Sequence, residues 1–252
     1  MKLPVFSIIT VTFNAVKVLE KTLLSIVNQT YGNIEYIIID GASVDGTVNI
    51  IRQFETRISY WISEHDNSLY HAMNKGLQTA TGDYVWFINA GDILKNVNVV
   101  SELANTAVRN DIPDILYGET DLIDSEGNIF AVRRLKAPKQ LTWKSFRMGM
   151  LVSHQYFIVK RDIAPEYDLK YRFSADFDWC IRCMKKANTI VNSGMRLINY
   201  QYEGGTTAMN RKASLKERYA IMCKYYGTVP TQIRHIWFAI RFYWAKLFKN
   251  NS

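Results

Sequence analysis

Five side chains stand at places where they could hold a nucleotide or a hard cation. Asp40 ends the apolar run EYIIID, Asp66 follows ISYWISEH, and Asn89 and Asp92 follow YVWFI in the segment NAGD. Asp176 opens a helical stretch in SADFDW. Oxygen ligands at the ends of buried strands have two common uses, which are binding the ribose or base of a nucleotide and coordinating a divalent cation.

The glycine-rich loops that usually cradle phosphates are missing. Neither GxGxxG nor GxxxxGK[ST] occurs, and GASVDG at residues 41–46 fits neither pattern. Dehydrogenase and P-loop functions are therefore disfavoured. A divalent cation that bridges a diphosphate would do similar work, because it would neutralise the charge that develops on a departing nucleoside diphosphate.

Hydrophobic periodicity indicates the elements that must position these side chains. Apolar runs predict strands at residues 5–13, 35–40, 59–63 and 84–88, and helical spacing predicts helices at 16–28, 47–55 and 69–79. Such alternation forms right-handed βαβ units with a parallel sheet. Since ligands bind beyond the carboxyl ends of these strands, Asp40, Asp66, Asn89 and Asp92 are expected to converge on one edge.

Beyond Asp92 the pattern predicts a mixed α+β half. The expected elements are a helix at 97–108, antiparallel strands within 115–134 with a turn at 125–128, a strand at 153–161, a helix at 175–186, a strand at 190–202, a flexible loop at 203–208 and helices over most of 214–249. Ser174 and Asp176 suit the first turn of the 175–186 helix.

Composition favours a folded protein without a membrane-spanning segment. The 252 residues are 48% hydrophobic, which is ample for a core. No window reaches about 18 apolar residues, and the N-terminal apolar run is too short for a signal peptide, so we expect a cytoplasmic protein. The three cysteines fit reduced thiols, and the pair in WCIRC lacks the context of a redox or zinc motif.

The positive charge is concentrated near the C-terminus. Of 31 basic and 23 acidic residues, nine and one fall after residue 210, which leaves 22 of each before it and a net charge of +8 after it. We interpret residues 211–252 as a basic appendage with a binding surface. No recognised nucleic-acid motif accompanies the charge.

A helix expected from about Thr231 onward is amphipathic. One face carries Ile233, Ile236, Trp237, Ile240, Tyr243, Trp244, Leu247 and Phe248, and the other carries Arg234, His235, Arg241, Lys246 and Lys249. Two interpretations remain. The helix packs on the domain with its basic side in solvent, or it docks in the plane of an anionic membrane.

These ordered motifs resemble family-2 glycosyltransferases with the GT-A fold. The resemblance rests on SIITVTFNAVKVLEKTLLSIVNQTYGNIEYIIIDGASVDGT and on SEHDNSLYHAMNKGLQTATGDYVWFINAGD, and it covers roughly residues 5–205. The second stretch is similar to a bacterial exopolysaccharide and lipopolysaccharide subgroup of the colanic-acid type. The resemblance implies a GT-A domain at 1–210, with a Rossmann-like nucleotide-sugar-binding half at 1–95 and an acceptor half at 96–210, followed by the amphipathic helical appendage.

The resemblance also implies roles on the donor side. Asp40 would bind the base of the donor nucleotide. The residues that would line the same pocket are Thr12, Phe13 and Asn14. Asp66 and the helix that carries Asn74 and Lys75 would face the ribose or the diphosphate.

Metal and catalytic roles follow in the same way. Asn89 and Asp92 occupy the place of the family's DxD motif, whose carboxylate binds Mn²⁺ or Mg²⁺. Asp176 falls where these enzymes keep a catalytic base, which takes the proton from an acceptor hydroxyl as that hydroxyl attacks the anomeric carbon with inversion. Asp178 is the alternative base. His154, in a His-Gln dipeptide that resembles one of the family, is either an acceptor-side residue or a structural one.

Three departures from the family pattern stand out. NAGD holds one carboxylate, Asp92, where forms such as DADD hold three. The usual Asp-x-Gly-Ile-Tyr-Asp is replaced from Asp66 to His71, and a frequent basic position falls at Met73, near Lys75. As an alternative to function, Asp40 and Asp92 could be helix caps or loop acids.

The sequence thus predicts an inverting, metal-dependent glycosyltransferase that moves a sugar from a nucleotide sugar to a glycan acceptor, lipid-linked, in cell-surface polysaccharide synthesis. We expect contact with the inner face of the cytoplasmic membrane through the C-terminal helix, and no nucleic-acid partner. The alternatives are a catalytically degenerate sugar-nucleotide-binding or assembly protein, and nucleotidyl transfer without the usual triphosphate loop.

Overall fold

The computed structural model describes residues 3–123, 129–132, 135–201 and 210–249. The strands are β1 (Phe6–Thr12), β2 (Ile34–Asp40), β3 (Tyr60–Ser63), β4 (Tyr84–Phe87), β5 (Ile93–Leu94), β6 (Ile115–Ile123), β7 (Ile129–Val132), β8 (Phe157–Lys160) and β9 (Ile190–Gln201). The α-helices are α1 (Leu19–Val27), α2 (Thr47–Gln53), α3 (Leu69–Thr79), α4 (Val99–Arg109), α5 (Ala175–Lys186), α7 (Arg211–Tyr226) and α8 (Thr228–Lys249).

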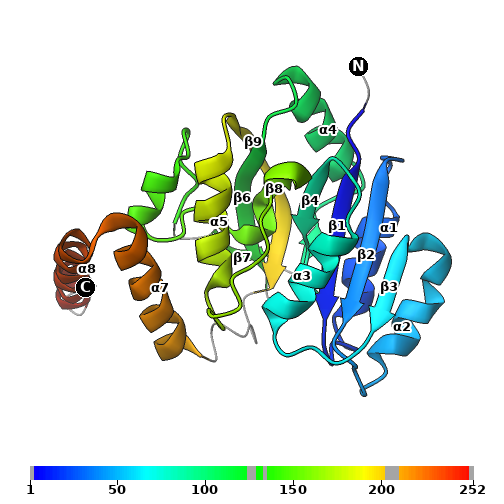
Figure 1. The fold of residues 1–252 in the computed structure, drawn as a ribbon, viewed down its shortest axis with the longest axis horizontal. Helices are drawn as coiled ribbons and strands as arrows, with labels where there is room; N and C mark the ends of the chain where they lie inside the picture. Colours follow the sequence, from blue (N-terminus) through cyan, green and yellow to red (C-terminus); the bar gives the residue numbers. More distant parts are fainter. Residues whose placement is uncertain (1–2, 124–128, 133–134, 202–209, 250–252) are drawn as a thin grey trace.

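One twisted sheet runs through the molecule with helices on both faces (Figure 1). Its strand order is β3-β2-β1-β4-β8-β6-β9-β5, and β7 pairs with β6 at the side. The first four strands of this order are parallel, with Thr12 opposite Asp40 and Asp40 opposite Ser63. The predicted βαβ half is confirmed, and the helices predicted at 69–79 and 175–186 coincide with α3 and α5.

The second half is mixed, as expected. β8 runs antiparallel to both β4 and β6, β7 runs antiparallel to β6, and β9 runs parallel to β6. The turn predicted at 125–128 and the loop predicted at 203–208 lie outside the described residues.

The strand predicted at 153–161 is wrong at its beginning. His154–Tyr156 form a 3₁₀ turn, and β8 begins only at Phe157. The indole Nε1 of Trp86 donates to the Gln155 carbonyl at 2.7 Å. A buried side chain therefore takes the hydrogen bond that a neighbouring strand would otherwise make.

Two hydrophobic cores lie on the two faces of the sheet. Neighbouring residues of β1 go to different cores, since Ile8 packs in one and Ile9 in the other, as the two-residue period of a strand requires. The core that contains Ile9 also takes in three residues of α7, which are Ile221, Met222 and Tyr226. Because α7 supplies core residues, we propose that the appendage begins near Gly227 and not at residue 211.

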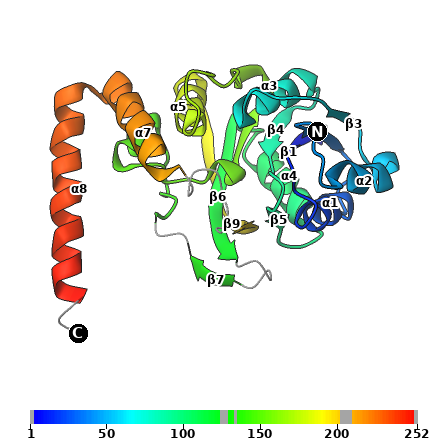
Figure 2. The ribbon, with the colours of Figure 1, turned by 90° about the horizontal axis from the view of Figure 1, so that it is seen from below.

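Helix α8 stands apart from the sheet at the end of the molecule that carries α5 and α7 (Figure 2). Gly227, at φ +85°, separates it from α7, a left-handed conformation that favours glycine. Within the described ranges, no helix combines the length and the apolar character needed to cross a membrane.

Candidate functional site

Asp40 is buried at the carboxyl end of β2 and its carboxylate is held on both oxygens. It accepts from the backbone N–H of Ser43 at 2.9 Å, from the Ser43 hydroxyl at 2.5 Å and from the Ser63 hydroxyl at 2.6 Å. The parallel register that sets Ser63 beside Asp40 explains the last contact. These bonds fix the start of the loop after β2 and join it to β3.

The loop at 41–46 is also tied to the end of β1. Asn14, at φ 47°, donates its backbone N–H to the Ser43 hydroxyl at 2.8 Å and accepts from the Val44 N–H at 3.0 Å. Phe13 is 64% exposed. The hydroxyl of Thr12 is buried and lacks a hydrogen-bond partner among the described residues. Thr12, Asn14 and Asp40 are thus brought together, with Phe13 at the rim.

Asp66 has one occupied oxygen and one vacant oxygen. Its Oδ1 lies 2.7 Å from His71 Nδ1 and 2.8 Å from Lys75 Nζ, whereas its Oδ2 is buried without a hydrogen-bond partner in the described part of the chain. His71 and Lys75 lie four residues apart and so share one face of α3. Lys75 also pairs with Glu64 at 2.6 Å. Burial lowers the pKa of Lys75, but its bonds to the two acids outweigh burial and leave that pKa raised.

Asn74 does not join this group. Its Nδ2 donates to the Tyr167 carbonyl at 3.0 Å and its Oδ1 accepts from the Tyr167 N–H at 2.7 Å. Both polar atoms of the buried amide are therefore bound to one backbone position, and the geometry gives no support to the donor contact predicted for Asn74. The side chain instead joins α3 to the segment before α5.

A line of hydrogen-bonding groups connects the strand end after β4 with α5. Asn89 Nδ2 lies 3.2 Å from His154 Nε2, and His154 Nδ1 lies 3.5 Å from Asp176 Oδ2. The Tyr70 hydroxyl donates to Asp176 Oδ1 at 3.2 Å. Because the Asn89 amide donates to Nε2, the proton of a neutral imidazole lies on Nδ1 and points to Asp176.

The surroundings of Asp176 keep its carboxylate ionised. Burial by itself raises the pKa of this carboxyl, but the hydrogen bond and charge of His154, the charge of Arg218 and the N–H of Phe177 outweigh burial, and the pKa is lowered. Tyr70 shows the opposite effect, because burial and the negative charge of Asp176 raise its pKa. Asp176 is thus an acceptor and Tyr70 a donor at neutral pH.

Asp178, the alternative base, is fully buried and saturated with partners. Its Oδ2 lies 2.6 Å from Arg182 Nε, and its Oδ1 lies 3.0 Å from Lys224 Nζ and accepts from the Tyr225 hydroxyl at 2.9 Å. Lys224 and Tyr225 belong to α7, so this carboxylate joins α7 to α5. Of the two acids, Asp176 is therefore the better candidate for a general base, because both oxygens of Asp178 are engaged by Arg182, Lys224 and Tyr225.

The NAGD segment forms a tight turn that contains two residues with hard oxygen atoms, Asn89 and the buried Asp92. Gly91, at φ +100°, donates to the Thr22 hydroxyl at 2.9 Å, and Asp92 Oδ2 accepts from the Asn89 N–H at 3.2 Å. The Asn89 Oδ1 is buried and has no hydrogen-bond partner within the described ranges. These same ranges contain no cluster of three His, Cys, Asp or Glu residues that could hold a metal. A cation here would therefore need oxygens from a bound diphosphate as well.

Sequence patterns missed several residues of this site. Ser43 and Ser63 hold Asp40, and Tyr70 bonds to Asp176. Tyr70 carries no distinguishing signal, since an aromatic at helical spacing is most often a core residue. Ser63 could have been found from its place at the end of a strand parallel to β2.

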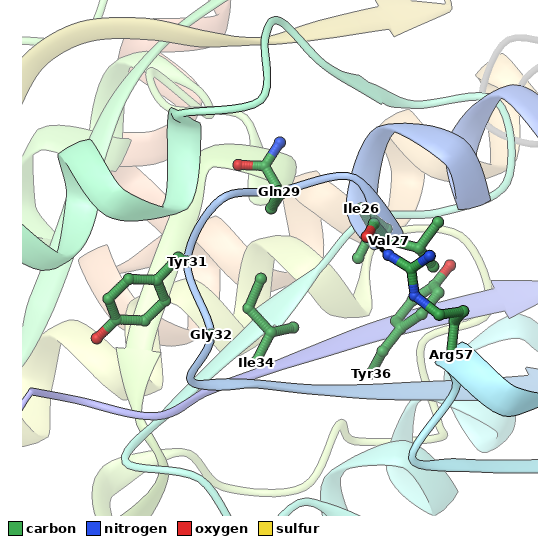
Figure 3. Close-up of a pocket in the computed structure, with 8 residues that line it drawn as sticks. All are labelled: Ile26, Val27, Gln29, Tyr31, Gly32, Ile34, Tyr36 and Arg57. Atoms are coloured by element: carbon green, nitrogen blue, oxygen red, sulfur yellow. Dashed lines mark hydrogen bonds between the residues drawn. The ribbon is translucent and has the colours of Figure 1, made fainter.

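A separate pocket lies at the opposite edge of the sheet, around the turn between α1 and β2 (Figure 3). Its single charged side chain is Arg57, whose guanidinium donates to the Val27 carbonyl. The pocket contains no carboxylate and lies beyond the amino ends of the parallel strands. It is therefore not the site described above.

Comparison with known proteins gives a consistent family. The model of Glycosyl transferase family 2 matches residues 7–167. The chain is 31% identical over 191 residues to a PGL/p-HBAD biosynthesis glycosyltransferase of Mycobacterium bovis, covering 73% of this chain and 71% of the relative. It is 26% identical to an uncharacterized glycosyltransferase of Haemophilus influenzae, covering 74% of each chain.

Solved structures share the fold. TarS 1–349 of S. aureus in complex with UDP-GlcNAc superposes with a TM-score of 0.68 at 18% identity over 86% of this chain. The mannosyltransferase PcManGT of Pyrobaculum calidifontis, in complex with GDP-Man and Mn²⁺, gives 0.63 at 18% identity over 89%. This chain spans only 64% and 65% of those two chains. The predicted GT-A class of α/β fold is confirmed.

Proposed function

Because this chain belongs to glycosyltransferase family 2, we propose that it transfers a sugar from a nucleotide-sugar donor to a hydroxyl of a glycan acceptor, with inversion at the anomeric carbon. The observation that carries the proposal is the line from Asn89 through His154 to Asp176. It sets an ionised, buried carboxylate next to the strand end where the donor diphosphate is expected.

In this mechanism Asp176 accepts the proton of the acceptor hydroxyl as the oxygen attacks the sugar from the side opposite the diphosphate. His154 and Tyr70 each donate to the carboxylate and so orient its remaining lone pairs. On the donor side, Asp40 with Thr12, Phe13 and Asn14 forms the base pocket. Asp66 and Lys75 face the ribose or the diphosphate.

We further propose that Asp92, assisted by Asn89 Oδ1, binds Mn²⁺ or Mg²⁺ together with the donor. The unpaired buried oxygen of Asn89 supports this assignment, and the shortage of protein carboxylates implies that affinity for the cation depends on the donor. When bound, the cation would neutralise charge on the leaving diphosphate. Mn²⁺ in the PcManGT complex supports the choice of metal by analogy.

The acceptor is proposed to be a lipid-linked glycan of cell-envelope synthesis, on the cytoplasmic side of the membrane. The named relatives belong to PGL/p-HBAD biosynthesis, and they lend no support to the colanic-acid subgroup predicted from sequence.

The test is transfer or hydrolysis of a panel of UDP- and GDP-sugars, with and without Mn²⁺. Asp176→Asn should lower turnover by about 10²-fold or more, because the general base is lost, while nucleotide binding by calorimetry stays intact. Asp168→Asn, in the loop before α5, is the matched control and should retain turnover. Full turnover in Asp176→Asn would refute the assignment, and the absence of any metal-linked nucleotide affinity would favour the degenerate binding protein.

A further inference from the structure

The outer face of α8 is apolar over the part whose side chains are described. Its exposed large apolar residues fall on one side of the helix and keep between 46% and 64% of their surface accessible, and they are Val229, Ile233, Ile236, Trp237 and Ile240. We call these five residues the outer stripe. A helix that covers a domain normally buries such a stripe, and monomeric proteins rarely leave one open to water.

The side of α8 that packs on α7 is different in character. Thr231 is fully buried, and the ring of His235 meets Tyr219 of α7 edge-on at 5.1 Å. Phe238 follows on the same side, with its ring 5.8 Å from His235. Of the two interpretations of this helix, packing of its apolar face on the domain is therefore wrong for residues 229–240. The outer stripe is turned away from the protein.

Charge identifies what could cover the outer stripe. Nine basic residues follow residue 210. Lys224 pairs with Asp178, and the positive charge of Arg218 helps to lower the pKa of Asp176. The single acid, Glu217, accepts from the backbone N–H groups of Arg172 and Phe173. Seven basic residues then remain without an acid in the same segment. A second copy of α8 would bring like charges together, whereas an anionic lipid surface offers the opposite charge.

We propose that α8 docks in the plane of an anionic lipid bilayer, with the outer stripe at the boundary of headgroups and acyl chains and the basic residues at the level of the headgroups. Isoleucine and tryptophan on the apolar side of a helix whose other side is basic suit this depth. Insertion across the bilayer does not compete, because no helix in the described ranges is long and apolar enough to span it.

The docked helix would be connected to α5, which carries Asp176, through α7. The Ser174 hydroxyl, next to α5, lies 2.9 Å from the Ser214 hydroxyl of α7, and Lys224 of α7 lies 3.0 Å from Asp178 of α5. The membrane therefore faces the end of the molecule that carries α5 and α7, seen at the side of α8 in Figure 2. Docking through the surface of α8 does not depend on the proposed transfer reaction.

The test is co-sedimentation of the full-length protein with vesicles of phosphatidylcholine alone or with about one third phosphatidylglycerol. We expect binding to the anionic vesicles only, weakened as salt rises from about 0.1 to about 0.5 M. Ile236→Glu combined with Trp237→Glu should lower the apparent partition coefficient by about tenfold or more. Deletion of residues 228–252 should abolish binding.

The matched control is Leu24→Glu combined with Val97→Glu. Both residues are exposed apolar side chains outside the appendage, and the pair adds the same charge. It should bind vesicles within about twofold of the unaltered protein. Equal losses in the two double variants, or equal binding to neutral vesicles, would overturn the proposal. So would a dimer, seen by light scattering, that Ile236→Glu with Trp237→Glu splits while vesicle binding is absent.

Discussion

At the scale of single residues, Asp176 and Asp178 show how position on a helix separates two identical side chains. Residues two apart on α5 point to nearly opposite sides. Asp178 therefore meets Lys224 and Tyr225 of α7, whereas Asp176 meets His154 and Tyr70. The first carboxylate is fully used in joining two helices, and the second keeps an arrangement that suits proton transfer.

Replacement of His154 by glutamine should change the pH dependence of turnover. His154 helps to lower the pKa of Asp176, so its loss lets burial raise that pKa. The base then becomes protonated at a higher pH, and the acidic limb of a kcat/KM profile should move to higher pH. At pH values above this limb, kcat/KM should fall less. A pH profile of sugar transfer measures the shift.

The same pKa has a consequence for stability, with a definite sign. A carboxyl whose folded pKa is lowered stabilises the fold above its ordinary pKa and loses that contribution as pH falls through the folded value. His154→Gln should therefore raise the pH at which the protein begins to lose stability on acidification. An unchanged acidic limb in the variant would show that His154 is only structural.

The positions of polar residues were predictable where they coincide with a strand end. Asp40 and Asp92 follow apolar runs, and the parallel sheet brings such ends to one edge. Asn74 was not predictable, because the backbone of Tyr167 that takes up its amide lies 93 positions away in the chain. Contacts at that separation leave no local pattern in the sequence.

At the scale of elements, α3 is the helix that serves both sides of the site. One face presents His71 and Lys75 to Asp66, while Tyr70 reaches Asp176. Ser68 caps the helix by accepting from the His71 N–H at 3.2 Å. Gly76 allows the helix to lie close to β1, since a Cβ built there would stand 2.4 Å from Ile9 Cγ2.

Gly76→Ala should destabilise the protein although alanine favours helix. Overpacking against a fully buried Ile9 costs about 1–3 kcal/mol, against a propensity gain of about 1 kcal/mol, which leaves a net loss of up to about 2 kcal/mol. Denaturant unfolding measures the change. Gly32→Ala is the control, because nothing lies within 4 Å of the added Cβ. Equal stability of the two variants would contradict the close approach of α3 to β1.

Elements with a clear period were predicted well and those with a special hydrogen bond were not. The limits of α3 follow from apolar spacing and the Ser68 cap, and those of α5 from apolar spacing, since the Ser174 hydroxyl makes no cap and bonds to Ser214 instead. The 3₁₀ turn at His154 was predicted as strand because its apolar neighbours favour β structure, and the Trp86 side chain that bonds its carbonyl belongs to another strand.

At the scale of the whole molecule, the C-terminal segment divides into two parts with different tasks. Helix α7 completes a hydrophobic core and fixes α5, whereas α8 leaves its outer stripe exposed. Charge alone placed the boundary at residue 211, since the basic residues run through both helices. The packing of α7 in the core supports an appendage that begins near Gly227, although both helices are basic.

Two truncations should reveal that division. Ending the chain after Gly227 removes α8 and should change the free energy of unfolding little. Ending it after Asn210 also removes Ile221, Met222 and Tyr226 from the core, at about 1.5–3 kcal/mol for each, which approaches the whole stability of a typical domain. Thermal unfolding distinguishes the two. Similar melting of both truncated proteins would show that α7 belongs to the appendage.

The double hydrogen bond between Asn74 and the Tyr167 backbone has an evolutionary consequence. It joins α3 to the segment that leads into α5, so a change in the position of one constrains the position of the other. In relatives whose residues 165–173 are remodelled, position 74 should change in the same branches, although no side chain at 167 need covary with it, since both hydrogen bonds use the Tyr167 backbone.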